Sequence, residues 1–369
     1  MAKPNILFVG QFAPPVHGVS VMNDFVANSE LIKKNYDYSI VNLTTATAIE
    51  DIGKPAVGKY LKFLGILINT LLKLLTRKYC CAYLTLSPVG FAFTKDAIVV
   101  QLIKLFKVPV VLHLHGKGIH KAIAVGGDKS LQRYNKVFKD TFVITLSEGL
   151  KQDIGAISSF KKCFVVNNGI PQPVKLNSPS KTDRVHILML SNLIRSKGAM
   201  DLLKAAKILV DDHVDGFNVT FAGAWSELDF MYEFRAFIND NNLAKYVSLP
   251  GPVYGDEKRE AFTKSDIFVL PTYYANECFP LTILEAMSYG LPVVTTSEGA
   301  IAEIIDHKKT GFLVPAQNPA GIAQVLKLLI RDKELRSMIG INALDKFNRH
   351  YRLDIFEKNL LHVFNQINS

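Results

Sequence analysis

NECFPLTILEAM, residues 276–287, is the most informative stretch of this chain. Pro280 suits the first position of a helix, because its missing N–H would have no acceptor there. The next three amides, those of residues 281–283, would lie in a first helical turn without intrahelical acceptors, at the positive end of the helix dipole. Glu277 precedes this turn, and Glu285 lies about 7.5 Å along the helix axis from Pro280. The stretch therefore predicts an anion site flanked by two carboxylates.

Apolar runs alternate with helical patterns along the rest of the chain, which at 369 residues is long enough for two domains. Runs that read as strands are 6–10, 38–43, 81–87, 108–113, 141–146 and 163–167, then 186–190, 217–222, 247–249, 267–270, 293–295 and 311–314. Strands alternating with helices predict an α/β protein with parallel, doubly wound sheets. The proline-rich, polar run 171–184 predicts a linker between residues 1–170 and residues 185–350.

The cysteines and the first residues of the chain indicate the cellular compartment in which the protein is expected. The four cysteines, at positions 80, 81, 163 and 278, have neither metal-ligand spacing nor the pattern of a disulfide framework, which favours a reducing compartment. The chain opens Met-Ala-Lys-Pro-Asn and continues directly into a strand pattern, so we expect no signal peptide.

The positive charge is concentrated in the first half of the chain. Residues 1–170 hold 21 Lys and Arg against 10 Asp and Glu, whereas the remainder is almost neutral. The segment Lys59–Lys78 has helical periodicity, basic ends and an apolar centre too short to span a bilayer. It fits either an interfacial amphipathic helix on an anionic membrane or a buried helix packed on a sheet. No aromatic residues interleave with arginine as base-stacking sites do, so nucleic acid is not an expected partner.

The two glutamates and their flanks resemble the Glu-x7-Glu signature of the retaining, nucleotide-sugar-dependent glycosyltransferases of the GT-B fold, family 4 (glycosyl transferases group 1). The flanking Phe279-Pro280-Leu281 and Gly290-Leu291-Pro292-Val293-Val294 fit as well. The resemblance implies two Rossmann-like domains facing a cleft, with residues 351–369 forming a helix that returns to the first domain. The donor would bind the second domain and the acceptor the first.

The resemblance also implies roles for individual residues. Glu277 would hold sugar hydroxyls and Glu285 the ribose, while the diphosphate would meet Phe279 and the amides of Leu281 and Thr282. Further donor contacts would come from Gly18, Asn192, Arg195, Lys197, Gly251 and Val253, and His115 would approach the transferred sugar. Asn192 stands where the family usually has arginine, and Arg195 is the candidate to supply that charge. The alternatives are an ordinary turn at Gly18, a structural histidine and a surface Lys/Arg pair.

The resemblance implies a hexosyltransferase-type enzyme that moves a sugar with retention from a nucleoside diphosphate-sugar, UDP-sugar favoured, to a saccharide acceptor. We expect a lipid-linked acceptor at the cytoplasmic face of a bacterial membrane, in surface polysaccharide or glycolipid biosynthesis. The chain contains no Asp-x-Asp, the usual metal clamp of the other main transferase fold, so we expect no metal and no cofactor.

Three other functions remain open at this point. A nucleotide-sugar 2-epimerase shares the fold and is the alternative; it would convert the donor without an acceptor. A glycoside hydrolase needs two carboxyl groups facing each other about 5–9.5 Å apart across one bond, which the two glutamates around a helix start do not suggest. A non-enzymatic sugar-nucleotide sensor would not need Lys197, His115 and both glutamates together.

Overall fold

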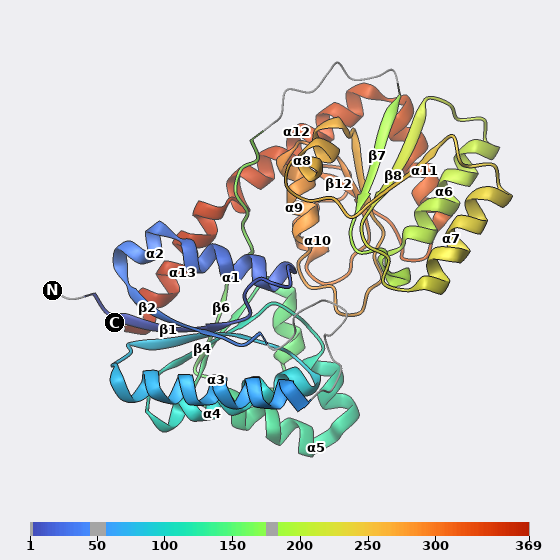
Figure 1. Ribbon diagram of the computed structural model, residues 1–369. Helices are drawn as coiled ribbons and strands as arrows, with labels where there is room; N and C mark the ends of the chain where they lie inside the picture. Colours follow the sequence, from blue (N-terminus) through green and yellow to red (C-terminus); the bar gives the residue numbers. More distant parts are fainter. Residues whose placement is uncertain (1–2, 45–56, 175–183, 369) are drawn as a thin grey trace. The chain divides into compact units, whose positions relative to one another are not determined.

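The computed structural model describes residues 3–44, 57–174 and 184–368. The chain divides into two compact units, the first of residues 1–169 with 353–369 and the second of residues 170–352. Each unit is built on one six-stranded parallel sheet with helices on its two faces (Figure 1). The predicted α/β class with two doubly wound sheets is confirmed. Most of the predicted linker 171–184 lies outside the described residues.

Unit 1 has the strand order β2-β1-β3-β4-β5-β6, with every neighbouring pair parallel. Its strands are β1 (Asn5–Gly10), β2 (Asp37–Asn42), β3 (Cys81–Leu86), β4 (Val110–Leu114), β5 (Phe142–Thr145) and β6 (Lys162–Val165). All residues of β3 and β4 are buried, as continuous apolar runs in the centre of a parallel sheet must be. Because β2 and β3 lie on opposite sides of β1, the sheet reverses its winding at β1.

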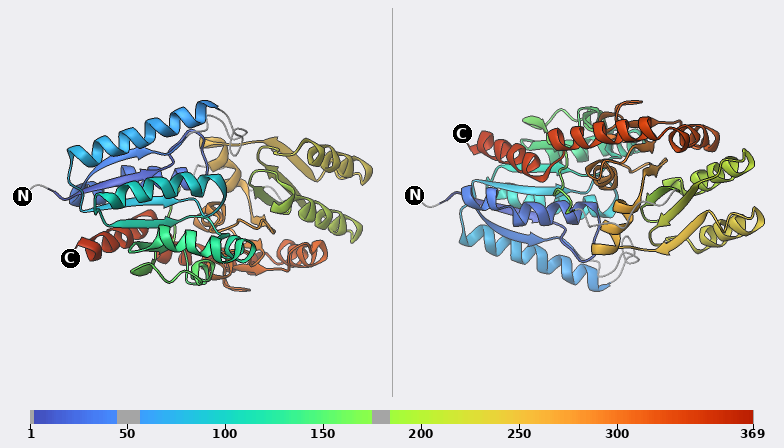
Figure 2. Two further views of the ribbon diagram at one scale, coloured as in Figure 1. Left: turned by 90° about the horizontal axis from the view of Figure 1, so that it is seen from below. Right: turned by 90° about the horizontal axis from the view of Figure 1, so that it is seen from above.

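The helices of unit 1 cover both faces of its sheet (Figures 1 and 2). One face carries α1 (Gly18–Asn28), α2 (Glu30–Asn35) and α13 (Leu353–Asn368), and the other carries α3 (Val57–Thr76), α4 (Gly90–Leu105) and α5 (Ile119–Phe138). The C-terminal helix α13 belongs to this unit, because Phe364 packs edge-on against Tyr36 and Tyr83, with ring centroids 5.9 and 5.6 Å apart. Phe356 of the same helix is buried as well.

Unit 2 has the strand order β12-β11-β10-β7-β8-β9, again all parallel. Its strands are β7 (Val185–Leu190), β8 (Phe217–Ala222), β9 (Val247–Gly251), β10 (Ile267–Leu270), β11 (Val293–Thr295) and β12 (Gly311–Leu313). Its α-helices are α6 (Ala199–Asp211), α7 (Leu228–Asp240), α8 (Gly255–Lys264), α9 (Leu281–Ser288), α10 (Ile301–Ile304), α11 (Pro319–Arg331) and α12 (Lys333–His350). Helices α6, α7 and α11 lie on one face of the sheet, and α8, α9 and α12 on the other (Figure 1).

Among the described helices, none is both long and apolar enough to cross a membrane. Helix α3 covers most of the segment Lys59–Lys78 and lies on the sheet of unit 1 with one side exposed to solvent. The two interpretations of this segment are therefore compatible: one face of the helix packs on the unit, and no described residue covers the side chains exposed on the opposite face.

Candidate functional site

The winding of the sheet of unit 2 reverses between two neighbouring strands, β7 and β10. These strands pair directly, with Ile187 opposite Ile267, and the chain leaves β7 toward β8 on one side and β10 toward β11 on the other. The connections that follow them, 191–198 and 271–280, therefore diverge at the carboxyl edge of the sheet. Open α/β sheets bind ligands at such a point. Both connections contain residues that the sequence singles out.

Backbone contacts hold the two connections together. The amide of Tyr273 donates a hydrogen bond to the carbonyl of Ser196 at 2.8 Å. Gly198 has a φ of +83° and lies so close to the carbonyl of Pro271 that a Cβ atom would collide with it. Glycine is required at position 198 by both its backbone conformation and this close approach. The preceding residue, Lys197, is thereby fixed against the connection that carries Glu277.

Lys197 and Glu277 form an ion pair at this edge. The Nζ atom of Lys197 lies 2.6 Å from Oε2 of Glu277, and the side chains are only 16% and 8% exposed. The ammonium also lies 4.9 Å from the centre of the Tyr274 ring, within cation–π range. Burying both charges has a desolvation cost, so the pair is weak evidence for a purely stabilising role. The structure thus brings together two side chains that the sequence predicts for one site.

The backbone of Glu277 is supported from behind by the connection after β11. The amide of Ala300 donates to the carbonyl of Cys278 at 2.8 Å. Gly299 has a φ of +58°, and a Cβ atom there would collide with the carbonyls of Glu277 and Cys278. Glu277 is therefore held by two neighbouring connections rather than by a free loop, and its carboxylate has a defined position.

Helix α9 begins at Leu281, and Pro280 directly precedes it instead of occupying its first position. Pro280 is the N-cap, with extended backbone, and Leu281 is the first helical residue. The amide of Ile283 donates to the carbonyl of Pro280 at 3.2 Å, so the expectation of three free amides is wrong. Leu281 and Thr282 remain as amides of the first turn without an intrahelical acceptor. An anion at this helix start would meet two amides.

Glu285 has a partner that the sequence interpretation missed. Its Oε1 atom lies 2.5 Å from Nζ of Lys258 on α8, while its Oε2 atom is buried without a hydrogen-bond partner. Burial raises the pKa of Glu285, and the neighbouring Lys258 ammonium opposes that rise. Lys258 stands four residues after Tyr254, in a segment that reads as an ordinary charged helix start, and its sequence context offers no signal of this contact. The arrangement holds one carboxylate oxygen on a cation and leaves the other buried, with no hydrogen-bond partner among the described residues.

The other predicted donor contacts of unit 2 have different surroundings. Arg195 forms a two-pronged pair with Glu233 of α7, with Nη1 3.0 Å from Oε1, and its guanidinium lies 4.6 Å from the Phe230 ring. Its charge is therefore already neutralised, and it would have to leave Glu233 to reach a diphosphate. Asn192 is exposed in the connection after β7. The arginine absent at position 192 has no observed replacement here.

Two predicted contacts lie at the end of β9. Gly251 ends that strand with a φ of +85°, and its carbonyl accepts a hydrogen bond from the amide of Gly223 at 2.9 Å. Val253 follows, partly buried, just before α8, the helix that carries Lys258.

The predicted contact Phe279 is buried, and its ring contacts the Tyr351 ring at 5.9 Å between centroids, so it acts in the packing of unit 2.

The predicted contact at Gly18 lies in unit 1, at the start of α1. Gly18 is the first residue of the helix, and the space around a Cβ atom there is open. The preceding His17 is the N-cap: its Nδ1 accepts from the amide of Ser20 at 3.3 Å, and the Ser20 hydroxyl accepts from the amide of His17 at 2.9 Å. This capping box uses one of the amides that a phosphate would otherwise meet.

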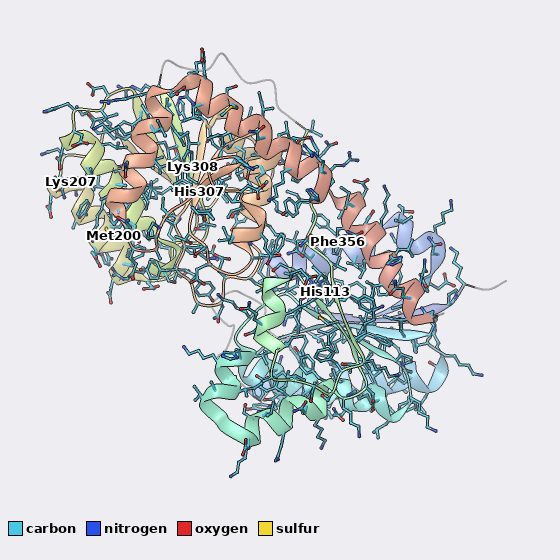
Figure 3. The ribbon with its side chains drawn as sticks, turned by 180° about the vertical axis from the view of Figure 1, so that it is seen from behind. His113, Met200, Lys207, His307, Lys308 and Phe356 are labelled. Atoms are coloured by element: carbon cyan, nitrogen blue, oxygen red, sulfur yellow. The ribbon has the colours of Figure 1, made fainter. Side chains whose placement is uncertain are left out.

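His115 follows β4 at the carboxyl edge of the sheet of unit 1. Its ring lies 4.0 Å, centroid to centroid, from that of His113. His113 is fully buried within β4 and is labelled in Figure 3. The Nδ1 atom of His113 is 2.6 Å from the hydroxyl of Tyr83. The Nε2 atoms of both histidines are buried and have no hydrogen-bond partner within the described part of the chain. Burial lowers the pKa of His115 to about 3 and lowers that of His113 as well. Both imidazoles are therefore neutral at pH 7.

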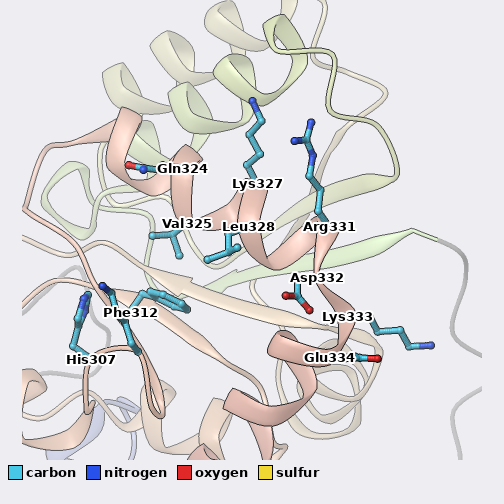
Figure 4. Close-up of a pocket in the computed structure, with 11 residues that line it drawn as sticks. His307, Phe312, Gln324, Val325, Lys327, Leu328, Arg331, Asp332, Lys333 and Glu334 are labelled. Atoms are coloured by element: carbon cyan, nitrogen blue, oxygen red, sulfur yellow. The ribbon is translucent and has the colours of Figure 1, made fainter.

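A cavity of about 1010 Å³ lies elsewhere in unit 2 (Figure 4). Its lining includes His307 and Lys308, which precede β12, and Arg331 at the end of α11. None of the residues predicted from the sequence lines it. It is at the amino end of β12, opposite the edge at which parallel sheets bind ligands. Within the described ranges, no three His, Cys, Asp or Glu side chains are arranged to hold a metal ion.

Comparison with known proteins finds a family model that matches most of unit 2. Residues 174–346 match the family model of glycosyl transferases group 1. An uncharacterized glycosyltransferase of Methanocaldococcus jannaschii is 26% identical over 277 residues, which cover 70% of this chain and 69% of that protein. A capsular polysaccharide biosynthesis glycosyltransferase of Staphylococcus aureus, CapM, is 26% identical over 255 residues, or 62% of each chain. Several other curated relatives are matched over less than two fifths of their own length.

Solved structures with the same fold cover the whole chain. The crystal structure of the Anabaena HepE protein in complex with UDP and glucose superposes with a TM-score of 0.74, over 98% of this chain and 99% of that one, at 18% identity. At this identity the similarity shows that the two chains share a fold.

Proposed function

We propose that the protein transfers a sugar from a nucleoside diphosphate-sugar to a saccharide acceptor, on the premise that residues 174–346 match the family model of glycosyl transferases group 1. The single observation that carries the proposal is the buried Lys197–Glu277 pair at the switch point of unit 2, beside the start of α9. The relatives named above are glycosyltransferases, so the epimerase of the same fold is not favoured.

We assign the donor to the carboxyl edge of unit 2. Its diphosphate would bind the amides of Leu281 and Thr282 and the ammonium of Lys197, because a helix start and a cation both favour a phosphate. Glu277 would accept hydrogen bonds from sugar hydroxyls, and the free Oε2 atom of Glu285 would accept one from the ribose. A UDP-sugar is the favoured donor, since the HepE protein of the same fold was crystallised with UDP.

The proposed reaction retains the configuration at the anomeric carbon. The bond from that carbon to the diphosphate oxygen breaks, and its electron pair goes to the leaving oxygen. The acceptor hydroxyl forms the new bond on the same face of the sugar and gives its proton to that oxygen. Negative charge grows on the diphosphate as the bond breaks, so cations and amides aimed there stabilise the transition state more than the bound donor.

We further propose that the neutral His115 donates or accepts a hydrogen bond at the transferred sugar, as the family resemblance implies. A lipid-linked acceptor in surface polysaccharide or glycolipid biosynthesis, on the cytoplasmic side of a membrane, is the candidate that the basic first half of the chain and the capsular relative support. Transfer is proposed to proceed without a metal; undiminished activity after treatment with a chelator is the expected result, and a loss restored by Mg²⁺ or Mn²⁺ would contradict it.

The proposal is tested by offering the purified protein a panel of nucleoside diphosphates and their sugars. A ligand that binds only the folded state stabilises it and so raises the melting temperature. At a free ligand concentration about a hundred times the dissociation constant, the added stability is about 2.7 kcal/mol. We expect at least one diphosphate, UDP first, to do so, and the corresponding sugar nucleotide to be consumed only when a saccharide acceptor is added. Donor conversion to an isomer without acceptor would instead identify an epimerase.

A further inference from the structure

Helix α3 is apolar on two opposite faces. Its inner face packs on unit 1: Thr70 and Leu74 are buried, and Phe63, Ile66 and Leu67 contact the core. Its outer face exposes apolar side chains at helical spacing, namely Leu61, Leu64, Ile68, Leu71, Leu72 and Leu75. The surface helices of globular proteins normally carry polar residues on the outer side. A contiguous exposed apolar surface of this kind marks an interaction site.

Helix α4 extends this apolar surface. It exposes Phe91, Ile98 and Leu105, which are seven residues apart and therefore lie on one side of the helix. The two helices lie side by side (Figures 1 and 2), and the Tyr60 ring of α3 is 6.0 Å, centroid to centroid, from the Phe91 ring of α4. We call the six apolar residues of α3 and these three of α4 the α3–α4 face.

Basic residues predominate in the part of the chain that forms the α3–α4 face, and the acidic Asp140 lies in one pocket with Lys104 and Lys107. Between positions 52 and 127 the sequence has eleven Lys and Arg and a single acidic residue, Asp96. Asp96 is buried, where it accepts a hydrogen bond from the amide of Ser87 at 2.9 Å, so it presents no charge outward. Lys62, Lys78 and Lys107 are exposed beside the apolar side chains. A partner must therefore offer both an apolar interior and an anionic surface.

An anionic lipid bilayer has both properties. No described helix can cross a membrane, but a helix with an apolar face and basic flanks lies in the interface, with its apolar side chains among the upper acyl chains. A second copy of this chain fits less well, because two α3–α4 faces would bring the flanking lysines of both copies together, and like charges repel.

We propose that the α3–α4 face docks unit 1 on an anionic membrane surface, with α3 and α4 lying in the plane of the interface. Leucine and isoleucine side chains enter the bilayer, while the surrounding lysines meet lipid phosphates. This inference deepens the proposed function, since it supplies the surface on which a lipid-linked acceptor is carried. Membrane binding is measured without any sugar donor, so its failure and a failure of the transferase assignment are separate results.

The test is flotation of the full-length protein with vesicles of phosphatidylcholine alone or mixed with phosphatidylglycerol. We expect binding to the mixed vesicles at low salt and weaker binding at high salt, because salt screens the lysine–phosphate attraction. The double substitution Leu64→Glu with Ile68→Glu is expected to lower the partition coefficient at least about tenfold. Lys62→Glu with Lys78→Glu is expected to lower it on anionic vesicles only.

A matched control places the same charges on an exposed apolar surface of unit 2. Met338 and Ile341 of α12 are exposed, and replacing both by glutamate is expected to leave flotation unchanged. Unchanged melting temperatures show that the variants are folded, which the exposure of the substituted side chains favours. The proposal is overturned if the wild-type protein does not float at low salt, if Leu64→Glu with Ile68→Glu floats equally well, or if that variant instead dissociates a dimer.

Discussion

The Nζ atom of Lys197 lies 2.6 Å from Oε2 of Glu277, although the two residues are eighty positions apart in the sequence. One follows β7 and the other follows β10, and the reversal of winding between these strands brings them to one edge. The pair holds a cation and a hydroxyl acceptor in place before any ligand arrives. A diphosphate at the start of α9 would give the cation a second anionic partner, which would free the carboxylate for the sugar.

Replacing Glu277 by glutamine is expected to lower kcat by more than tenfold, with a smaller change in the KM for the donor. The amide keeps the shape of the carboxylate but binds hydroxyls more weakly, and the loss falls on kcat if the contact is strongest in the transition state. Steady-state kinetics of the purified variant measure both constants. Glu260→Gln, on the exposed side of α8, is the control, and equal kcat values for the two variants would remove Glu277 from the reaction.

Replacing Lys258 by methionine is expected to raise the KM for the donor while kcat changes little. Without the ammonium, burial raises the pKa of Glu285 further, so the protonated carboxyl persists to higher pH and accepts hydrogen bonds less well. Only the deprotonated carboxylate of Glu285 accepts hydrogen bonds with both oxygens. As the pH is lowered, donor binding should therefore begin to weaken at a higher pH in the variant than in the wild type. Isothermal titration with UDP between pH 5.5 and pH 8 checks the shift, and parallel pH profiles would contradict the assignment.

The buried histidines make unit 1 sensitive to acid. In the folded state their pKa values lie below the ordinary value of 6.5, so between those values the unfolded chain binds more protons and stability rises with pH. The contribution of each histidine is therefore fully present only above about pH 6.5. Acidification to pH 5.5 should cost about 1.4 kcal/mol at His115, and His113 should add to the loss in the same direction. Thermal melts from pH 7.5 to pH 5.5 measure this slope. His115→Asn should reduce it, whereas His213→Asn, at an exposed site of unit 2, should not.

The sequence alone predicted the strands of both sheets, because buried parallel strands are short apolar runs that alternate with helices. Strands β8, β10 and β11 begin and end where the runs do. Helix α5 was given no bounds from the sequence, and it is interrupted at Gly127, whose backbone is not helical. Pro280 is the extended residue before α9 and not its first residue, because proline suits both positions.

Only part of the candidate site could be predicted from the sequence. Lys197 and Glu277 were found because each follows a strand in a recognisable context, and the topology brings them together. Lys258 was missed, because its contact with Glu285 depends on how α8 packs beside α9 and not on any local pattern. The pairing of Arg195 with Glu233 was missed for the same reason, since α7 supplies the carboxylate from 38 positions away.

The central claim is that Lys197 supplies positive charge to the departing diphosphate, and its most direct test is the kcat/KM of a Lys197→Gln variant. Glutamine can still donate a hydrogen bond to Glu277, so the buried carboxylate keeps a partner while the charge is removed. The matched control is Lys207→Gln, which breaks an exposed pair with Asp211 on α6 (Figure 3). We predict a fall of about a hundredfold or more in kcat/KM for Lys197→Gln, with a folded protein by thermal melt, and none for Lys207→Gln. A Lys197→Gln enzyme within threefold of the wild type would contradict the claim.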